Sequence, residues 1–193
     1  MLLSEDGKSF TAFDMYVPDA SMTSVINLYG TKTRYIRLDI ARGSYVSIFE
    51  FAAYEATEAD VEAGKDRVER VNVAQGKPVT ATTHEASYVK ENAVDGDTTT
   101  RWGSLPSGQA WLQVDLEQVY RLNGLELFLE SAWVPYRIEY STDGKSYQTL
   151  YEGAKDELRV VLDDLGEIEA RYIRLSRDGE NWFSIYEIAV YGE

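Results

Sequence analysis

An internal repeat is the feature that most constrains the fold of this 193-residue chain. Ser4-Glu-Asp-Gly-Lys-Ser-Phe10 resembles Ser141-Thr-Asp-Gly-Lys-Ser-Tyr147, and Arg34-Tyr-Ile-Arg-Leu38 recurs as Arg171-Tyr-Ile-Arg-Leu175. Both pairs lie 137 positions apart, and the same offset relates Ser47-Ile48, Glu50 and Tyr54 to Ser184-Ile185, Glu187 and Tyr191. Asp-Gly turns and Arg-Tyr strands recur in many β proteins, but separate coincidences would not share one register. The repeat therefore predicts two copies of one structural unit.

The offset also predicts the domain organisation. Residues 1–55 match only the end of residues 72–193, so we expect a truncated first copy followed by a complete second copy. Residues 56–71 lie between them, are rich in charge and lack aromatics, which is typical of an interdomain connector. A turn or two of helix is expected there, ending before Gly64.

The complete copy reads as a series of short strands with period-two apolar patterns. We expect eight of them, near residues 79–83, 110–116, 124–129, 136–141, 147–152, 157–162, 170–176 and 184–191. Asp143-Gly144 predicts a tight turn between two of them. The predicted fold is all-β, an eight-stranded antiparallel β-sandwich of jelly-roll type. The first copy would hold only the last four strands, leaving open edges and an uncovered core face.

Composition excludes several function classes. The formal net charge of −14 disfavours nucleic acid and anionic membranes as partners. The chain has no cysteine, so it has neither disulfides nor thiolate metal sites, and it has one histidine, His84. No phosphate-binding loop or catalytic metal motif is present, which argues against an enzyme. No apolar run is long enough to span a membrane, and any export signal would lie upstream.

The loop that precedes the strand at 110–116 is rich in oxygen donors. Asp95-Gly96-Asp97 is followed by three threonines, 98–100. Carboxylates and hydroxyls next to a glycine that allows a sharp turn could hold a hard cation. A polar turn in which the same side chains cap backbone amides is the alternative.

An ordered set of motifs carries a family resemblance. It comprises Asn72–Ala81, Ala93–Asp97, Thr100–Trp102, Trp111–Leu116, Tyr136–Gly144, Arg171–Leu175 and Tyr186–Gly192. This order resembles the discoidin domain, also called the coagulation factor V/VIII type C domain, and in particular its bacterial carbohydrate-binding-module branch. The resemblance implies a galactose-binding-like jelly roll and a structural Ca²⁺. The family's ion ligands match Asp95, Asp97, Thr100 and Glu187, and the first copy keeps only Glu50.

The resemblance also implies that loops at one end of the sandwich bind sugar. An aromatic ring can stack on a pyranose while polar side chains hydrogen-bond to its hydroxyls. The candidate residues on these loops are His84, Glu85, Tyr88, Ser104, Glu130, Trp133, Arg177, Asn181 and Trp182. Trp102 and Trp111 are assigned to the core, Phe183 is expected to face inward, and Arg101 is expected to pair with acids near the ion loop.

These observations predict a non-catalytic carbohydrate-binding module. Glu85, Glu130, Asp178 and Glu180 would make the rim of the site anionic, which fits a neutral or amino sugar of galactose or glucosamine type. The module would anchor a secreted or surface-attached bacterial glycan-active enzyme or adhesin, with catalytic or other modules of the same polypeptide as neighbours. The alternative is a discoidin-type adhesion domain that binds protein or phospholipid.

Overall fold

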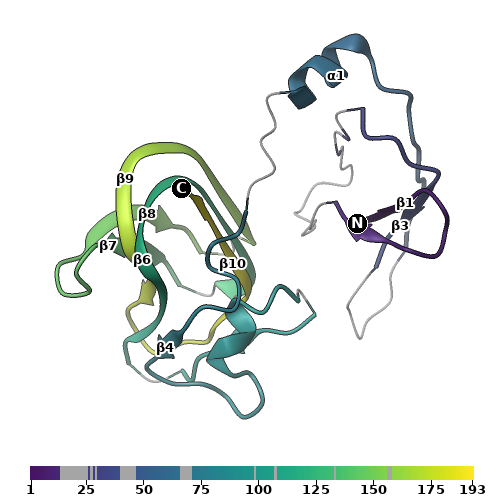
Figure 1. The fold of residues 1–193 in the computed structure, drawn as a ribbon. Coiled ribbons are helices and arrows are strands. Elements are labelled where there is room, and N and C mark those ends of the chain that lie inside the picture. Colours follow the sequence, from purple (N-terminus) through teal and green to yellow (C-terminus); the bar gives the residue numbers. More distant parts are fainter. Residues whose placement is uncertain are drawn as a thin grey trace. The chain divides into compact units, whose positions relative to one another are not determined.

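The protein is described here by a computed structural model (Figure 1). The structure describes residues 1–13, 26, 28, 30–39, 47–65, 71–97, 99–106, 108–132, 134–155 and 158–193. The chain divides into two compact units, Met1–Glu69 and Arg70–Glu193. None of the helices in the described part of the chain is long and apolar enough to cross a membrane.

The N-terminal unit contains a small antiparallel sheet and one helix. The sheet order is β2-β1-β3, formed by β1 (Leu2–Ser4), β2 (Thr11–Ala12) and β3 (Tyr35–Arg37). Helix α1 (Glu58–Lys65) begins after Thr57, whose hydroxyl accepts a hydrogen bond from the Asp60 amide while Asp60 Oδ2 accepts one from the Thr57 amide. The predicted connector thus holds a helix, and this helix continues through Gly64 to Lys65, two residues further than expected.

The C-terminal unit is built from antiparallel strands joined into one hydrogen-bonded sheet that folds over on itself. Its order is β5-β10-β6-β9-β7-β8, with β4 paired to β6. The elements are β4 (Val79–Ala81), the 3₁₀ helix η1 (Lys90–Ala93), β5 (Trp102–Gly103), β6 (Ala110–Ala132), β7 (Tyr136–Ser141), β8 (Gln148–Gly153), β9 (Arg159–Arg177) and β10 (Phe183–Gly192).

Two long strands pass from one layer of the sandwich to the other. The first part of β6 pairs with β4 and with the end of β9, whereas its second part pairs with β10 and with the start of β9. The register shifts between Asp115 and Tyr120 and again between Leu122 and Gly124. At this bend Glu117 has a φ of 70°, and its amide donates to Asp115 Oδ1.

The all-β sandwich is confirmed, but its strand count differs from the prediction. The segments expected as separate strands at 110–116 and 124–129 form the single 23-residue β6, and those at 157–162 and 170–176 form the 19-residue β9. The polar residues between them had indicated loops. Pairing of β6 with β9 is interrupted by register shifts there and resumes beyond each of them, so the strands bend instead of ending.

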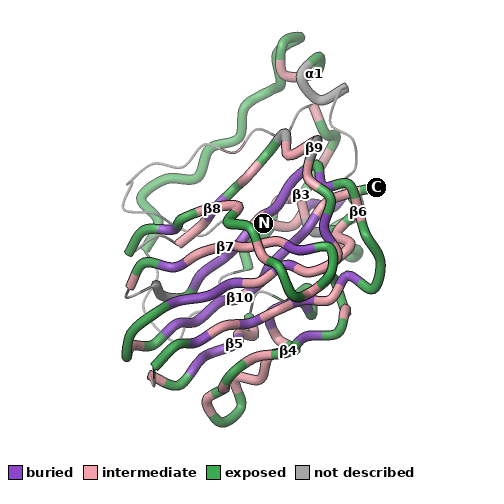
Figure 2. The backbone as a smooth tube through the Cα atoms, turned by 90° about the vertical axis from the view of Figure 1, so that its left-hand side faces the viewer, coloured by how far each residue is buried: buried purple, intermediate pink, exposed green. Residues whose placement is uncertain are grey.

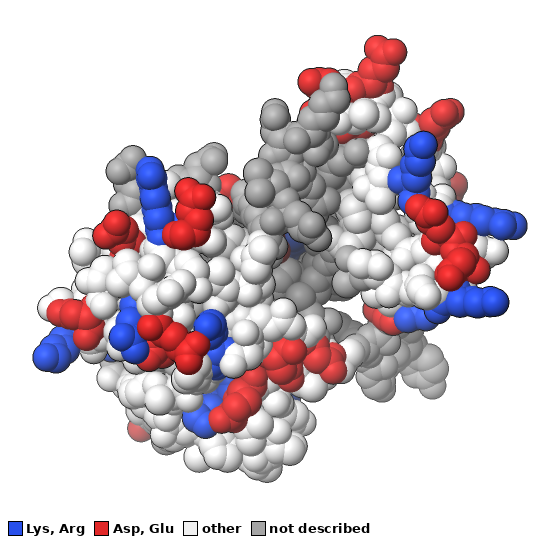
Figure 3. All heavy atoms as spheres, in the orientation of Figure 1, with Lys and Arg blue, Asp and Glu red and all other residues white. Residues whose placement is uncertain are grey.

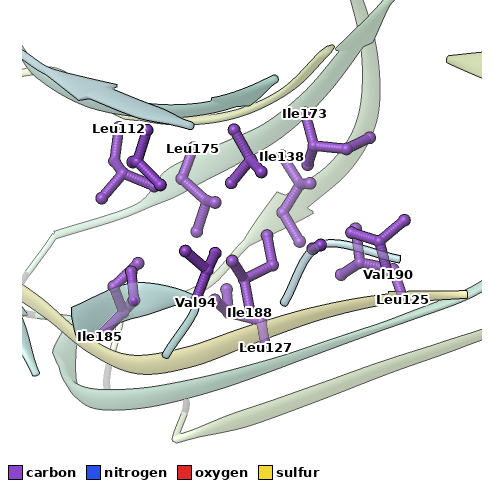
Figure 4. Close-up of a cluster of buried hydrophobic side chains, with 14 of the residues drawn as sticks. Val94, Leu112, Leu125, Leu127, Ile138, Ile173, Leu175, Ile185, Ile188 and Val190 are labelled. Atoms are coloured by element: carbon purple, nitrogen blue, oxygen red, sulfur yellow. The ribbon is translucent and has the colours of Figure 1, made fainter. Parts of the chain in front are cut away.

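The core lies between the two layers. Leu112, Ile138 and Ile173 on one layer face Leu127 and Ile188 on the other, and all five side chains are fully buried (Figure 4). Buried residues concentrate on the strands, and much of the connecting loops is exposed (Figure 2). Trp102 is fully buried as predicted, but Trp111 is only partly buried. Acidic and basic side chains lie interspersed on the face drawn in Figure 3.

Candidate functional site

A pocket opens where loops and strand ends of the C-terminal unit meet. Its volume is about 290 Å³. It is lined by two carboxylates, one guanidinium, one indole, one phenyl ring, two serines and a glycine, namely Glu85, Arg101, Gly103, Ser104, Glu130, Trp182, Phe183 and Ser184. These residues come from the loop after β4, from β5 and its flanks, from the end of β6 and from the start of β10. Segments from distant parts of the chain therefore meet at this pocket.

Backbone hydrogen bonds hold the loop after β4 against β5. The Glu85 amide donates to the Gly103 carbonyl over 2.8 Å, and the Gly103 amide donates to the Tyr88 carbonyl over 3.2 Å. Ala86, between them, has a φ of 40°, so the loop turns tightly. The buried indole of Trp102 adds a further link, because its Nε1 donates to the Thr83 carbonyl over 3.0 Å. The position of Glu85 is thereby fixed by β5, the strand that directly follows Arg101.

Arg101 lies at the centre of the pocket's polar contacts. Its guanidinium carbon lies 3.7 Å from the ring centroid of Tyr88, and its Nη1 donates to Ser184 Oγ over 2.6 Å. The same Nη1 lies 3.5 Å from a carboxylate oxygen of Glu130. Arg101 was expected to pair with acids near the ion loop, so its place in this pocket was missed. The relevant signal was its position directly before Trp102, which was assigned to the core.

The two acids of the pocket differ in their partners. Glu130 is paired with Arg101. For Glu85, no ion pair exists among the residues that the structure describes, and its side chain is partly buried at the pocket wall. The pocket therefore holds one carboxylate whose charge is balanced and one whose charge is not. Such an arrangement favours a ligand that donates hydrogen bonds or carries a positive charge.

Arg177 was predicted to contact sugar, and the structure shows it buried instead. It is fully inaccessible, and its guanidinium donates to the carbonyls of Gly108 (2.6 Å), Leu105 (3.0 Å) and Gly179. Burial lowers the pKa of Arg177 from its ordinary value, and the nearby Asp178 opposes that shift. Sequence could not reveal this, because the carbonyls come from loops before β6 and after β9. The side chain braces the loops below the surface and is not available to a ligand.

The other predicted sugar-binding residues fall into three groups. Trp182 is 41 % exposed and lines the pocket, whereas Ser104 also lines it but is buried. Tyr88 lies beneath the Arg101 guanidinium, and His84 and Asn181 lie outside the pocket lining. Trp133 lies outside the described residues. As predicted, Phe183 faces inward at the start of β10, with its ring 6.1 Å from that of Trp102.

The predicted ion loop meets the last strand at one buried carboxylate. Glu187 is 2 % exposed, and its Oε2 accepts a hydrogen bond from the Gly96 amide over 3.2 Å. Its other oxygen, Oε1, is buried with no hydrogen-bond partner in the described part of the chain. Desolvation, opposed by the Gly96 amide and reinforced by Asp95 and Asp97, raises the pKa of Glu187 to about 8. A cation is one group that would satisfy this oxygen.

The remaining predicted ion ligands bond within their own loop. Thr100 Oγ1 donates to Asp95 Oδ2 over 2.7 Å, and Thr99 donates to Asp97 Oδ1 from both its amide and its hydroxyl. These bonds lower the pKa of Asp97. Among the described residues, no three histidine, cysteine or acidic side chains converge as a preformed metal cluster. The orphaned oxygen of Glu187 and the oxygen chemistry of the loop fit a hard cation.

The chain is similar to one protein family and to solved carbohydrate-binding proteins. The family model for the F5/8 type C domain matches residues 78–189. Chitosan-binding module 1 of a chitosanase/glucanase from Paenibacillus sp. IK-5 is 27 % identical, with a TM-score of 0.58 over 63 % of this chain and 99 % of that one. A Clostridium perfringens protein, solved with GlcNAc-α-1,4-galactose, is 20 % identical, with a TM-score of 0.57 over 65 % of this chain and 96 % of that one.

One curated relative extends the comparison to a longer protein. A polysaccharide lyase 8 family protein, HylA of Enterococcus faecalis, is 37 % identical over 90 residues, which is 45 % of this chain. The match spans only 7 % of that protein's length.

Proposed function

The chain belongs to the F5/8 type C domain family, and on this premise we propose that it is a non-catalytic carbohydrate-binding module whose pocket receives a sugar. The observation that carries the proposal is the juxtaposition of Glu85, Arg101 and Glu130 with the exposed indole of Trp182 in one pocket. A pyranose offers an apolar face to an aromatic ring and vicinal hydroxyls to carboxylate and guanidinium groups. The pocket supplies both kinds of contact within one opening.

The charges of the pocket favour an amino sugar over an acidic one. Glu130 is partly neutralised by Arg101, and Glu85 has no ion-pair partner in the described part of the chain, so the carboxylate of Glu85 sets the sign of the site. An ammonium group would pair with Glu85, whereas a uronic acid would be repelled by it. The ligand class we propose is therefore a neutral or amino sugar, with glucosamine-type units preferred. The chitosan-binding module from Paenibacillus, which shares this fold, is consistent with that choice.

A structural Ca²⁺ is part of the proposal. Glu187 on β10 and Asp95, Asp97 and Thr100 in the loop after η1 would hold it. The ion would supply positive charge to the buried carboxylate of Glu187 and to the acids of the loop. Binding there would tie the 95–100 loop to the last strand, and this loop leads directly into Arg101 and Trp102. The 95–100 loop, held in this way, would keep Arg101 in place beside Glu130.

The proposed context is a larger extracellular protein. The similarity to a stretch of a polysaccharide lyase 8 family protein supports a role as an accessory module of a secreted bacterial glycan-active enzyme or adhesin. In that role the module would hold neighbouring catalytic modules near a polysaccharide and raise their effective concentration there. The adhesion alternative, with an anionic phospholipid as ligand, is less favoured because Glu85 would repel the headgroup.

The test is a screen of the full chain against immobilised glycans that include chitosan, chitin and galactose-containing polymers. We expect retention on at least one of them, and Trp182→Ala should weaken it about three- to tenfold, the range given by the loss of an aromatic contact. Tyr54→Ala, an exposed aromatic of the N-terminal unit, is the matched control and should bind like the parent. Retention on no glycan, together with sedimentation on anionic vesicles, would contradict the proposal in favour of adhesion.

A further inference from the structure

The N-terminal sheet has the same strand register as part of the C-terminal unit. In the N-terminal unit β1 pairs Leu2 with Ala12 and with Arg37. Adding the sequence offset of 137 to these numbers gives Glu139, Thr149 and Arg174, and β7 pairs Glu139 with Thr149 and with Arg174. The remaining pairs of β1 agree in the same way: Leu3↔Thr11, Leu3↔Ile36 and Ser4↔Tyr35 match Tyr140↔Gln148, Tyr140↔Ile173 and Ser141↔Tyr172. The order β2-β1-β3 thus corresponds to β8-β7-β9.

The turn after the first of these strands is also the same. Asp6 Oδ1 accepts hydrogen bonds from the amides of Lys8 and Ser9, each over 2.8 Å. Asp143 Oδ1 accepts the equivalent bonds from Lys145 and Ser146 over 2.8 and 2.9 Å. The glycines of the two turns, Gly7 and Gly144, have φ angles of 72° and 70°. Each glycine lies against a tyrosine ring, Tyr35 in one unit and Tyr172 in the other.

Side-chain stacking repeats as well. Arg37 stacks on Phe10 with 4.3 Å between guanidinium carbon and ring centroid, and Arg174 stacks on Tyr147 at 3.5 Å. Arg34 and Tyr35 are 5.3 Å apart by the same measure, and Arg171 and Tyr172 are 5.1 Å apart. Register, turn and stacking agree at one offset, so the N-terminal sheet has the local structure of the second half of an F5/8 type C domain.

One strand of that second half differs sharply between the units. In the C-terminal unit residues 184–191 belong to β10, where Ile185 and Ile188 are fully buried. The corresponding residues 47–54 form no strand, and all of them are exposed. Ile48, Phe49 and Phe51 are 53 %, 101 % and 55 % exposed. The segment that forms a buried strand in the C-terminal unit thus has an exposed counterpart in the N-terminal unit.

The sheet order explains why residues 47–54, the counterpart of β10, form no strand in the N-terminal unit. In the C-terminal unit Asn72 and Val73 bond to the end of β10, and the two strands that pair with it are β5 and β6. Both of these strands come from the first half of the domain, residues 72–135. By contrast, β7 and β8 pair with each other and β7 pairs with β9, so these three strands can associate without the first half. The N-terminal unit contains the equivalents of these three and has no counterpart of β5 and β6 in its described residues.

We propose that residues 47–54 are an interaction surface for a polypeptide that carries the first half of an F5/8 type C domain, the equivalent of residues 72–135. Its β5-like and β6-like strands would pair on either side of residues 47–54, which would become the β10 equivalent of a second domain. The occupant follows from the C-terminal unit, where first-half strands cover the same positions. Burial of Ile48 and Phe51 against the β5-like and β6-like strands would drive the association.

The experiment extends the full chain at its N-terminus with a second copy of its own residues 72–137. Met1 corresponds to Ile138, so this junction preserves the register of the repeat. Amide hydrogen exchange of residues 47–54 is measured with and without the extension. We expect exchange there to slow by at least about tenfold in the extended chain, because the backbone amides enter a sheet. Unchanged exchange in the extended chain, or slow exchange already in the parent chain, would overturn the proposal.

Two controls keep the result specific. Leu125→Asp with Leu127→Asp, placed only in the added copy, should abolish the protection, since both leucines are buried on β6. Ile48→Asp with Phe51→Asp in the extended chain should do the same, whereas Lys8→Glu, a charge change in an exposed turn, should leave protection intact. Sedimentation of the unextended chain tests a second copy as occupant. A dimer that Phe51→Asp dissolves would assign the surface to self-association and overturn the proposal.

Discussion

The guanidinium of Arg101 lies 3.7 Å from the ring centroid of Tyr88, and this stack links the loop after β4 to strand β5. Because Nη1 of the same guanidinium donates to Ser184 Oγ over 2.6 Å, Arg101 also connects β5 to β10. A single planar cation therefore fixes three segments that border the pocket. Lysine could supply the charge but not the flat surface and the directed donors.

Arg101→Lys should therefore weaken glycan binding more than it weakens the fold. We expect about tenfold lower affinity, measured by isothermal titration, with less than about 1 kcal/mol lost in the free energy of unfolding. Arg137→Lys is the matched control, since Arg137 pairs with Asp178 outside the pocket. Equal affinity of Arg101→Lys and the parent would contradict the role given to the stack.

Glu85→Gln tests the preference for amino sugars. A charge-assisted hydrogen bond contributes about 1.5–3 kcal/mol, so the variant should bind glucosamine oligomers at least about tenfold more weakly. N-acetylglucosamine oligomers carry no ammonium group, and their affinity should change little. Glu180→Gln, an exposed acid outside the pocket lining, is the control. Equal losses for both oligomers would leave sugar binding in place but remove the charge argument.

Calcium should stabilise the C-terminal unit through Glu187. A ligand present at 100 times its Kd adds about 2.7 kcal/mol, so saturating Ca²⁺ after chelation should raise Tm by more than about 5 °C. Glu187→Gln should abolish this shift, because it removes the buried carboxylate that has no other partner for Oε1 in the described residues. Glu152→Gln on the exposed side of β8 should retain it. A Ca²⁺-independent Tm in the parent chain would remove the ion from the proposal.

Arg177→Met should destabilise the fold whether or not sugar is present. The substitution leaves the carbonyls of Gly108, Leu105 and Gly179 without their donor in a buried place, which costs about 2–4 kcal/mol. Urea denaturation followed by tryptophan fluorescence measures the loss. Arg137→Met, at a partly exposed position, should cost less than about 1 kcal/mol. A near-neutral Arg177→Met would argue that the side chain can leave its site and reach a ligand.

The pair of Asp115 and Arg171 predicts a loss of stability in acid. Arg171 donates to both carboxylate oxygens of Asp115 over 2.8 and 3.0 Å, and this bonding lowers the pKa of Asp115. A lowered pKa in the folded state means that the contribution is complete above the unfolded value, about 3.9, and disappears as the pH falls through the folded value. The parent should therefore be more stable than Asp115→Asn near pH 6, and the difference in Tm should begin to shrink below about pH 4 and vanish once the pH is below the lowered pKa of Asp115. A constant difference would assign the effect to packing.

The fold was largely predictable from sequence, and the pocket only in part. Alternating apolar residues fixed the strands on either side of the core, and Glu85, Glu130 and Trp182 were chosen because loops of a sandwich gather at its ends. Arg101 was missed because its partner Ser184 lies 83 positions away, across the pairing of β5 with β10. Arg177 was misplaced because nothing in its local sequence shows that the carbonyls of Leu105 and Gly108, 72 and 69 positions away, join that of Gly179 around it.

The sequence by itself determined the all-β class, the family and the 137-residue offset, since each of these is written in local periodicity and in the order of short motifs. Only the tertiary structure decided which polar side chains face the pocket and which brace it from below. The physical reason is that burial and charge pairing depend on strand neighbours far apart in the chain. Arg101 and Arg177 illustrate this: both are arginines beside loops, but β10 places one at the pocket, and the carbonyls of two loops enclose the other.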